Sequence, residues 1–155
     1  MADLPNKTRV LIVGGGIVGC SVAYHLTKIG WSDVALLEQG RLSCGTTWHA
    51  AGLVGQLRAT QNQTELAKYT RDLYTGLEGE TGQTTGYRST GSISVARTFE
   101  REEELKRQSG MAAAFGVEVQ RISLNDAKER APLLNIDDLV AAYLIPSDGM
   151  TNPTD

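Results

Sequence analysis

The stretch Arg9-Val-Leu-Ile-Val-Gly-Gly-Gly-Ile-Val-Gly19 decides the fold of this chain. After Arg9, the four residues Val10-Leu-Ile-Val13 are apolar and mostly β-branched, which is typical of a buried parallel strand. Glycines at positions 14, 16 and 19 follow at once and match the pattern GxGxxG. A glycine cluster directly after such a strand indicates a tight turn into a helix.

Helical spacing begins directly after these glycines. Ile17–Ile29 carries apolar residues at steps of three and four, which predicts an amphipathic helix that ends at Gly30. The segment Asp33-Val-Ala-Leu-Leu-Glu38 predicts a second strand. Strand, turn, helix and strand within about thirty residues form a βαβ crossover, whose right-handed closure makes the two strands parallel.

The glycine pattern in this setting is the fingerprint of a dinucleotide-binding turn. Gly14 permits the sharp turn, Gly16 lets the backbone approach a pyrophosphate, and Gly19 allows the helix to pack closely on the strand. The free N–H groups and partial positive charge of the helix N-terminus then bind the phosphates without a basic side chain. The predicted fold class is therefore α/β, with a Rossmann-like FAD/NAD(P)-binding domain.

Glu38 ends the second predicted strand, nineteen residues after Gly19. An acidic side chain at this place accepts hydrogen bonds from the ribose hydroxyls of the adenosine half. It would repel a 2′-phosphate, which disfavours NADP but does not separate FAD from NAD. Both dinucleotides stay open on these residues alone.

The segment Gly40–Gly55 is rich in Gly, Ser and Thr, which indicates a functional loop leading into a short helix near Thr47. Gly45, Thr46 and Thr47 could form a second anion-binding helix start. Without a family to compare, a lone histidine is more often a packing or surface residue than a site residue. His49 alone would therefore be only suggestive.

The remaining chain shows weaker periodicity and a different balance of elements. The pattern predicts helices over 63–77, 100–115 and 124–130 and strands over 87–98, 117–122 and 139–145. The run Glu100-Arg-Glu-Glu-Glu104 is interpreted as a solvated helix face with i,i+4 pairs from Glu102 to Lys106 and from Glu103 to Arg107. We expect residues 1–60 to form the dinucleotide-binding βαβ unit with its loop, and residues 61–155 to begin a second, β-rich subdomain. The sheet is expected to be incomplete, as in a truncated domain.

Composition excludes several function classes. The 155 residues hold 15 Lys and Arg against 18 Asp and Glu, without the basic stripe of a nucleic-acid surface. No apolar run approaches the roughly 20 residues that span a bilayer, and no signal or transit peptide is visible at the start. The default location is cytoplasmic, or the mitochondrial matrix in a eukaryote. Cys20 and Cys44 are interpreted as reduced packing residues, and no metal site is expected.

The glycine turn, Glu38 and Gly45-Thr-Thr-Trp-His-Ala-Ala-Gly52 resemble the dimethylglycine and sarcosine dehydrogenases of the D-amino-acid-oxidase-like flavoproteins. In that family the histidine of this motif is joined to the 8α-methyl group of FAD, which implies that His49 is the covalent attachment residue. The resemblance also implies cofactor contacts at Ile17, Val18, Gln39, Gly45, Thr46, Thr47, Trp48, Ala50, Ala51, Gly52 and Leu53, beside Gly14, Gly16, Gly19 and Glu38.

The resemblance further implies an FAD-dependent oxidoreductase that demethylates a small N-methyl amino acid such as sarcosine or dimethylglycine. Hydride would pass to the flavin, and a longer parent chain could also bind tetrahydrofolate. No residue is assigned as a general base, and the electron acceptor is not identified. The isolated chain is expected to be inactive. The alternatives are a non-catalytic FAD-binding fragment and an NAD-binding dehydrogenase fragment, which would give no account of Trp48 and His49.

Overall fold

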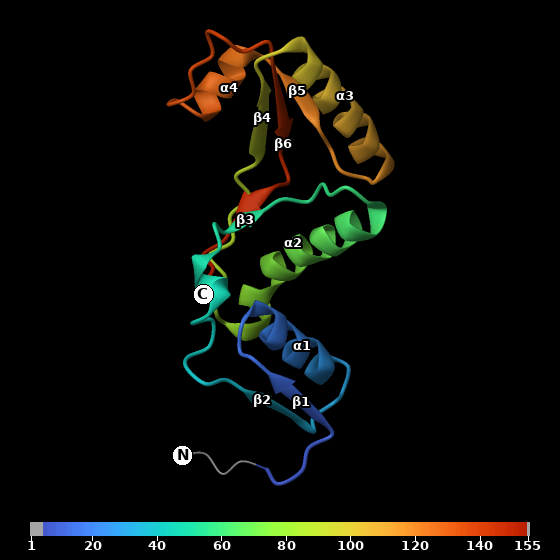
Figure 1. Cartoon of the computed structure of the whole chain (residues 1–155), viewed down its shortest axis with the longest axis vertical. Helices are drawn as coiled ribbons and strands as arrows, with labels where there is room; N and C mark the ends of the chain where they lie inside the picture. The colour runs from blue at the N-terminus through green and yellow to red at the C-terminus, as the bar shows by residue number, and fades with distance from the viewer. Residues whose placement is uncertain (1–4, 155) are drawn as a thin grey trace. The chain divides into compact units, whose positions relative to one another are not determined.

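The computed structural model describes residues 5–154, and they fall into two compact units. The first unit runs to Ala51 and the second covers Gly52–Pro153. Figure 1 labels the helices and strands of both, and each unit is described by itself. No helix in the described part of the chain is long and apolar enough to cross a membrane.

The first unit is a βαβ crossover followed by a loop with one short helix. Its elements are β1 (Val10–Val13), α1 (Ile17–Lys28), β2 (Val34–Leu37) and the 3-10 helix η1 (Thr46–His49). Strands β1 and β2 pair in parallel, in a register that begins with Val10 opposite Val34. The predicted strand, helix and parallel strand are therefore confirmed.

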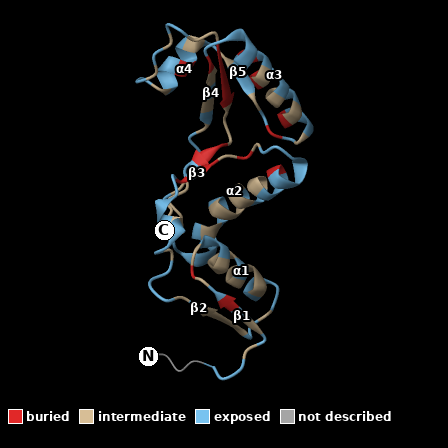
Figure 2. Ribbon diagram, in the orientation of Figure 1, coloured by how far each residue is buried: buried red, intermediate tan, exposed pale blue. Residues whose placement is uncertain are grey.

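Burial in this unit is lower than the apolar pattern predicts. Only Ile12 of β1 is buried, whereas the Val13 side chain is 80% exposed. Helix α1 has no buried residue, and Val18 of its apolar stripe is 74% exposed. The prediction of a buried strand is wrong for this unit, because β1 pairs with β2 alone among the described residues. The coloured ribbon of Figure 2 shows this difference from the second unit.

The second unit holds two small antiparallel sheets and three helices. Sheet order is β4-β6-β5 in one sheet and β3-β7 in the other. All of their strand pairs are antiparallel. The elements are β3 (Leu53–Val54), α2 (Gln61–Thr81), β4 (Ser92–Ala96), α3 (Phe99–Ala114), β5 (Gln120–Ile122), α4 (Leu124–Arg130), β6 (Ala141–Ile145) and β7 (Gly149–Met150).

The core of the second unit lies between α3 and the three-stranded sheet. Ala96, Leu105, Ala141 and Tyr143 form one buried cluster. The first four residues of the central strand β6 are all buried, so this strand is covered on both faces. Figure 2 shows the buried colour concentrated along β6. Burial on both faces explains why β6 reads as a continuous apolar run.

Side-chain caps fix where the helices of this unit begin. The hydroxyl oxygens of Thr60, Thr98 and Ser123 accept hydrogen bonds from backbone N–H groups at the starts of α2, α3 and α4. Ser123 forms a complete capping box with Asp126. Such caps stabilise a helix by about 1 kcal/mol each. The predicted bounds of α4 agree with the structure, while α2 extends beyond the predicted segment at both ends.

Two expectations about charged and sulfur-bearing residues are wrong. Glu102 is buried, and its carboxylate accepts a hydrogen bond from Arg121 of β5 at 3.0 Å. The predicted solvated face of α3 therefore contributes an ion pair to the fold. Cys44 is exposed, so it is not a packing residue, although both cysteines are free thiols as expected.

Candidate functional site

The glycine turn joins the end of β1 to the start of α1. Gly14 has a φ of +106°, a conformation that L side chains rarely adopt. A Cβ atom at Gly19 would overlap the carbonyl oxygen of Gly14, so only glycine allows this first turn of α1 to lie against the preceding loop. The sharp turn at Gly14 and the close packing of α1 at Gly19 are therefore found at the residues predicted for them.

The start of α1 has no cap from its own N-cap residue, Gly16. The hydroxyl oxygen of Thr47 takes that place and accepts a hydrogen bond from the Ile17 N–H at 3.0 Å. A Cβ atom at Gly16 would lie 3.1 Å from the same oxygen. Since the first N–H groups of a helix have no intrahelical partner, those that remain can bind an anion. The hydroxyl proton of Thr47 is itself a possible donor to that anion.

Glu38 directly follows β2 and turns its carboxylate toward the same glycine turn. Its Oε2 accepts a hydrogen bond from the Gly15 N–H at 2.7 Å, and its Oε1 accepts one from the Gly40 N–H at 2.9 Å. The hydrogen bond from Gly15 makes the largest contribution, and that from Gly40 the next, to a pKa of Glu38 below its usual range. The carboxylate is therefore ionised near neutral pH, and its remaining lone pairs can accept ribose hydroxyls.

The loop with the Trp-His pair forms η1, near the position expected for a short helix. The Trp48 Nε1–H donates to the carbonyl oxygen of Cys44, and the rings of Trp48 and His49 lie 3.9 Å apart between centroids. The Nδ1 of His49 lies 3.1 Å from the carbonyl oxygen of Gly45. Because a carbonyl can only accept, this bond places the proton of a neutral imidazole on Nδ1 and leaves the lone pair on Nε2.

The last predicted contact residues belong to the second unit. Gly52 has a φ of +72°, and its carbonyl oxygen accepts a hydrogen bond from the Thr151 N–H at 2.8 Å. The Leu53 side chain in β3 is 79% exposed. Within the first unit the structure therefore brings together the glycine turn, Glu38 and Thr47, with His49 at the end of η1.

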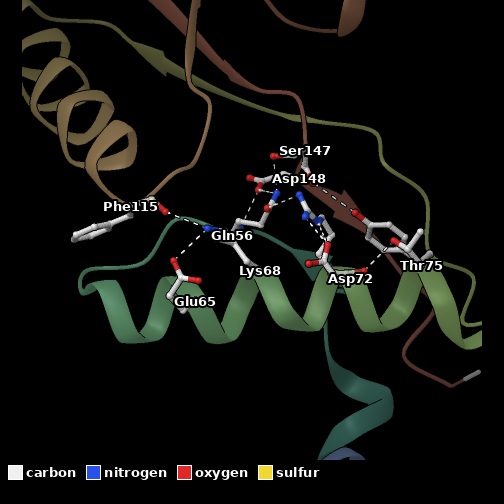
Figure 3. A network of polar contacts seen from close by, with 10 residues as sticks. Gln56, Glu65, Lys68, Asp72, Thr75, Phe115, Ser147 and Asp148 are labelled. Carbon is white, nitrogen blue, oxygen red and sulfur yellow. Dashed lines mark hydrogen bonds and ion pairs between the residues drawn. The ribbon is translucent and has the colours of Figure 1, made fainter.

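A buried polar network in the second unit was missed by the sequence reasoning (Figure 3). Gln56 is 2% exposed and Asp148 is 5% exposed. The backbone N–H of Gln56 donates to Asp148 Oδ1 at 2.8 Å, and its side-chain oxygen accepts from Arg71 at 2.9 Å. Ser92 donates its hydroxyl to Asp148 at 2.6 Å. No short motif marks these residues, because they lie in four separate segments of the chain.

The described residues fit a dinucleotide at the first unit. The turn offers a helix start whose own N-cap residue has no side chain, with no Cβ atom at Gly14, Gly15 or Gly16, and Glu38 adds an ionised acceptor beside it. Among the residues that the structure describes, no group of three or more His, Cys, Asp or Glu could hold a metal ion.

Comparison with known proteins gives one family. The DAO family model, described as FAD dependent oxidoreductase, matches residues 9–155. The chain is 45% identical over 152 residues to the mitochondrial pyruvate dehydrogenase phosphatase regulatory subunit of Mus musculus and 42% identical over 151 residues to the mitochondrial sarcosine dehydrogenase of Homo sapiens. These alignments cover 98% and 97% of the chain.

Two further comparisons extend the range of similar proteins. The chain is 43% identical over 150 residues to the formaldehyde-forming 4-methylaminobutanoate oxidase of Paenarthrobacter nicotinovorans, with 97% of the chain covered. The crystal structure of L-proline dehydrogenase from P. horikoshii superposes with a TM-score of 0.90 at 29% identity, over 97% of this chain and 40% of that one. The chain spans 17%, 16% and 18% of the lengths of the three curated relatives.

Proposed function

This chain belongs to the DAO family of FAD-dependent oxidoreductases, and from that premise we propose that it is the FAD-binding part of an enzyme that oxidises an N-methylated amino acid. Relatives that are 42% and 43% identical are named for sarcosine and for 4-methylaminobutanoate, both of which are small N-methylamino acids. The family match favours FAD over the alternative of NAD. The substrate class rests on these two relatives.

We assign the adenosine diphosphate half of FAD to the first unit. Gly14, Gly16 and Gly19 shape the turn, the start of α1 binds the pyrophosphate, and Glu38 accepts the ribose hydroxyls. When bound, FAD supplies the electron acceptor for the carbon–nitrogen bond that is oxidised. The chain's own part is to bind the cofactor, orient it and place a nucleophile near it.

We assign covalent attachment of the flavin to His49. Attachment needs a neutral imidazole nitrogen with a free lone pair. The bond from Nδ1 to the Gly45 carbonyl supports this role, because it holds the ring in one tautomer and leaves Nε2 available. Trp48, whose ring lies against that of His49, limits the directions in which the imidazole can turn. Ala50 and Ala51, whose small side chains follow His49, complete the proposed cofactor loop.

One observation carries this proposal: Thr47 joins the two parts of the site. Its hydroxyl oxygen bonds the first N–H of α1, and it stands two residues before His49 in the same short helix. The turn that would bind the pyrophosphate and the loop that would hold the flavin are therefore one connected structure. The glycine motif alone or the histidine alone would be weaker support for the proposal than this connection.

The test is the fate of FAD when the enzyme that contains this chain is denatured. FAD should remain with the protein through acid precipitation, and a tryptic peptide containing Trp48 and His49 should carry the flavin mass. His49→Ala should release all of its FAD on precipitation. His25→Ala is the matched control, because this other histidine lies within α1 and should leave the flavin attached. Release of all FAD by the wild-type enzyme, or a flavin mass on another peptide, would show that His49 is not the attachment residue.

A second candidate is a non-catalytic FAD-binding module. The similarity that favours it is the 45% identity to a protein named as a regulatory subunit. Reduction of an artificial dye that depends on an added N-methyl amino acid separates the two candidates. The complete enzyme should show this reduction, and a regulatory module that binds FAD should not.

Two finer assignments depend on a longer parent chain. Tetrahydrofolate binding remains a prediction for such a chain. The names of the two mammalian relatives support a mitochondrial location, for which we propose the matrix, and fractionation of cells that express the parent protein would test it.

A further inference from the structure

The carboxylate of Glu38 holds two separate backbone segments of the first unit at once. Its Oε2 accepts from Gly15 in the glycine turn at 2.7 Å, and its Oε1 accepts from Gly40 in the loop after β2 at 2.9 Å. Both distances are those of strong hydrogen bonds to a charged acceptor. Recognition of a ribose alone would require neither bond.

Gly15 is the central glycine of the turn, and the GxGxxG pattern does not demand it. A Cβ atom at Gly15 would lie 2.6 Å from Leu42 Cδ2 and 3.0 Å from Glu38 Cβ. The Glu38 side chain therefore packs directly over this peptide group, and its two neighbouring methylene carbons leave no space for another side chain. Glycine at position 15 follows from the contact with Glu38 and Leu42.

Gly15 is held through its carbonyl group as well. Its carbonyl oxygen accepts a hydrogen bond from the Ser43 N–H at 2.9 Å. Ser43 adopts a φ of +61°, which is uncommon for a residue with a side chain. With its N–H bonded to Glu38 and its carbonyl bonded to Ser43, Gly15 has the peptide groups on both of its sides held in place. The N–H groups that follow it at the start of α1 are then presented in a fixed arrangement.

We propose that Glu38 is a positioning residue for the phosphate-binding turn, in addition to its assigned contact with the ribose. Its carboxylate fixes the Gly15 peptide and the loop after β2 before the cofactor arrives, so that the helix start meets the pyrophosphate without rearrangement. This inference rests on the proposed function, in which the turn binds the pyrophosphate of FAD.

The two roles of Glu38 predict opposite effects on an anion that lacks a ribose. A carboxylate near an anion site repels the anion, so removing its charge should strengthen the binding of inorganic pyrophosphate if Glu38 only contacts the ribose. If Glu38 positions the turn, the same change should weaken that binding. Glu38→Gln is the suitable variant, because it keeps the shape of the side chain but turns one acceptor into a donor that faces a backbone N–H.

The experiment is calorimetric titration of the 155-residue chain with inorganic pyrophosphate. Glu38→Gln should bind pyrophosphate at least about fivefold more weakly than the wild type, although the loss of a negative charge would by itself strengthen the binding. Asp33→Asn is the matched control, because it removes the same charge at the other end of β2, where its carboxylate accepts from Thr8 and Arg9. The control should bind pyrophosphate as tightly as the wild type or slightly more tightly.

A measurement without a ligand or a variant tests the contact itself. The NMR shift of the Gly15 amide proton in the wild type should change with pH as Glu38 is protonated, below the ordinary range of a glutamate. The Cys44 thiol also contacts Glu38, with Sγ 3.9 Å from Oε1. A Gly15 shift that does not respond to pH in this range would overturn the positioning role.

The outcomes separate this inference from the proposed function. Tighter or unchanged pyrophosphate binding by Glu38→Gln would overturn the positioning role and leave the cofactor site standing. A wild-type chain that binds no pyrophosphate, while its Gly15 amide follows the protonation of Glu38, would overturn the cofactor site. Weaker binding by Glu38→Gln together with a pH-dependent Gly15 shift would support both.

Discussion

The hydroxyl oxygen of Thr47 accepts a hydrogen bond from the Ile17 N–H at 3.0 Å, across a separation of 30 residues. A side chain from the loop after β2 therefore caps the helix that follows β1. The local sequence of α1 offers no such cap, because its N-cap residue is Gly16. This bond makes the glycine turn and the Trp-His loop one structure.

Loss of the Thr47 hydroxyl should weaken both the fold and the cofactor site. Thr47→Val keeps the shape of the side chain but leaves the Ile17 N–H without its acceptor, which should lower the free energy of unfolding by about 1 kcal/mol. ADP should also bind several-fold more weakly in a calorimetric titration, since a donor to the phosphates is lost. Thr47→Ser retains the hydroxyl and should restore most of both values. Equal losses in the Ser and Val variants would contradict the role of the hydroxyl.

The contribution of Glu38 to stability should disappear in acid. Its pKa is lowered in the folded chain, first of all by the hydrogen bond from Gly15. The stabilisation is therefore fully present above the pKa of the unfolded chain and is lost as pH falls through the lowered folded value. The difference in the free energy of unfolding between the wild type and Glu38→Gln, measured in urea, should be constant above about pH 5.5 and shrink below it. A difference that grows in acid would contradict the assignment.

The buried network around Gln56 should be the most sensitive part of the second unit. Gln56→Leu would remove the side-chain donor to Ser147 and Asp148 and the acceptor for Arg71, while the backbone N–H of residue 56 would still donate to Asp148. We expect a loss of about 1–3 kcal/mol in the free energy of unfolding, because polar groups that lose their partners inside the protein are costly. Gln63→Leu is the control, since Gln63 is exposed on α2, and it should change stability by less than about 0.5 kcal/mol. Equal effects of the two changes would contradict the role of the network.

Two adjacent glutamates of α3 should differ in their importance. Glu102 is buried and bonded to Arg121 of β5, whereas Glu103 is exposed and pairs with Lys106 on its own helix. Glu102→Ala should lower the free energy of unfolding by about 2 kcal/mol, and Glu103→Ala by no more than about 0.5 kcal/mol. Thermal unfolding of the two variants beside the wild type gives the comparison. A larger loss for Glu103→Ala would show that the link from α3 to β5 contributes little.

Local patterns accounted for much of the fold. The βαβ crossover followed from one glycine cluster between two apolar runs, and α4 has the bounds that its sequence predicts. The short strands β3 and β7 were missed, because two residues show no periodicity and their pairing joins segments that are far apart in the chain. The burial of Glu102 was missed because its partner, Arg121, lies outside α3 on strand β5.

The sequence by itself determined the kind of turn, the place of Glu38 and the position of the Trp-His loop, because each depends on neighbouring residues or on a fixed spacing. Only the tertiary structure decided how these parts are joined. The cap that Thr47 gives to α1, the bond from Gly15 to Glu38 and the burial of Gln56 beside Asp148 are contacts between distant segments. Hydrogen bonds of this kind form when the packed chain brings a donor within about 3 Å of an acceptor, and no local spacing encodes that distance.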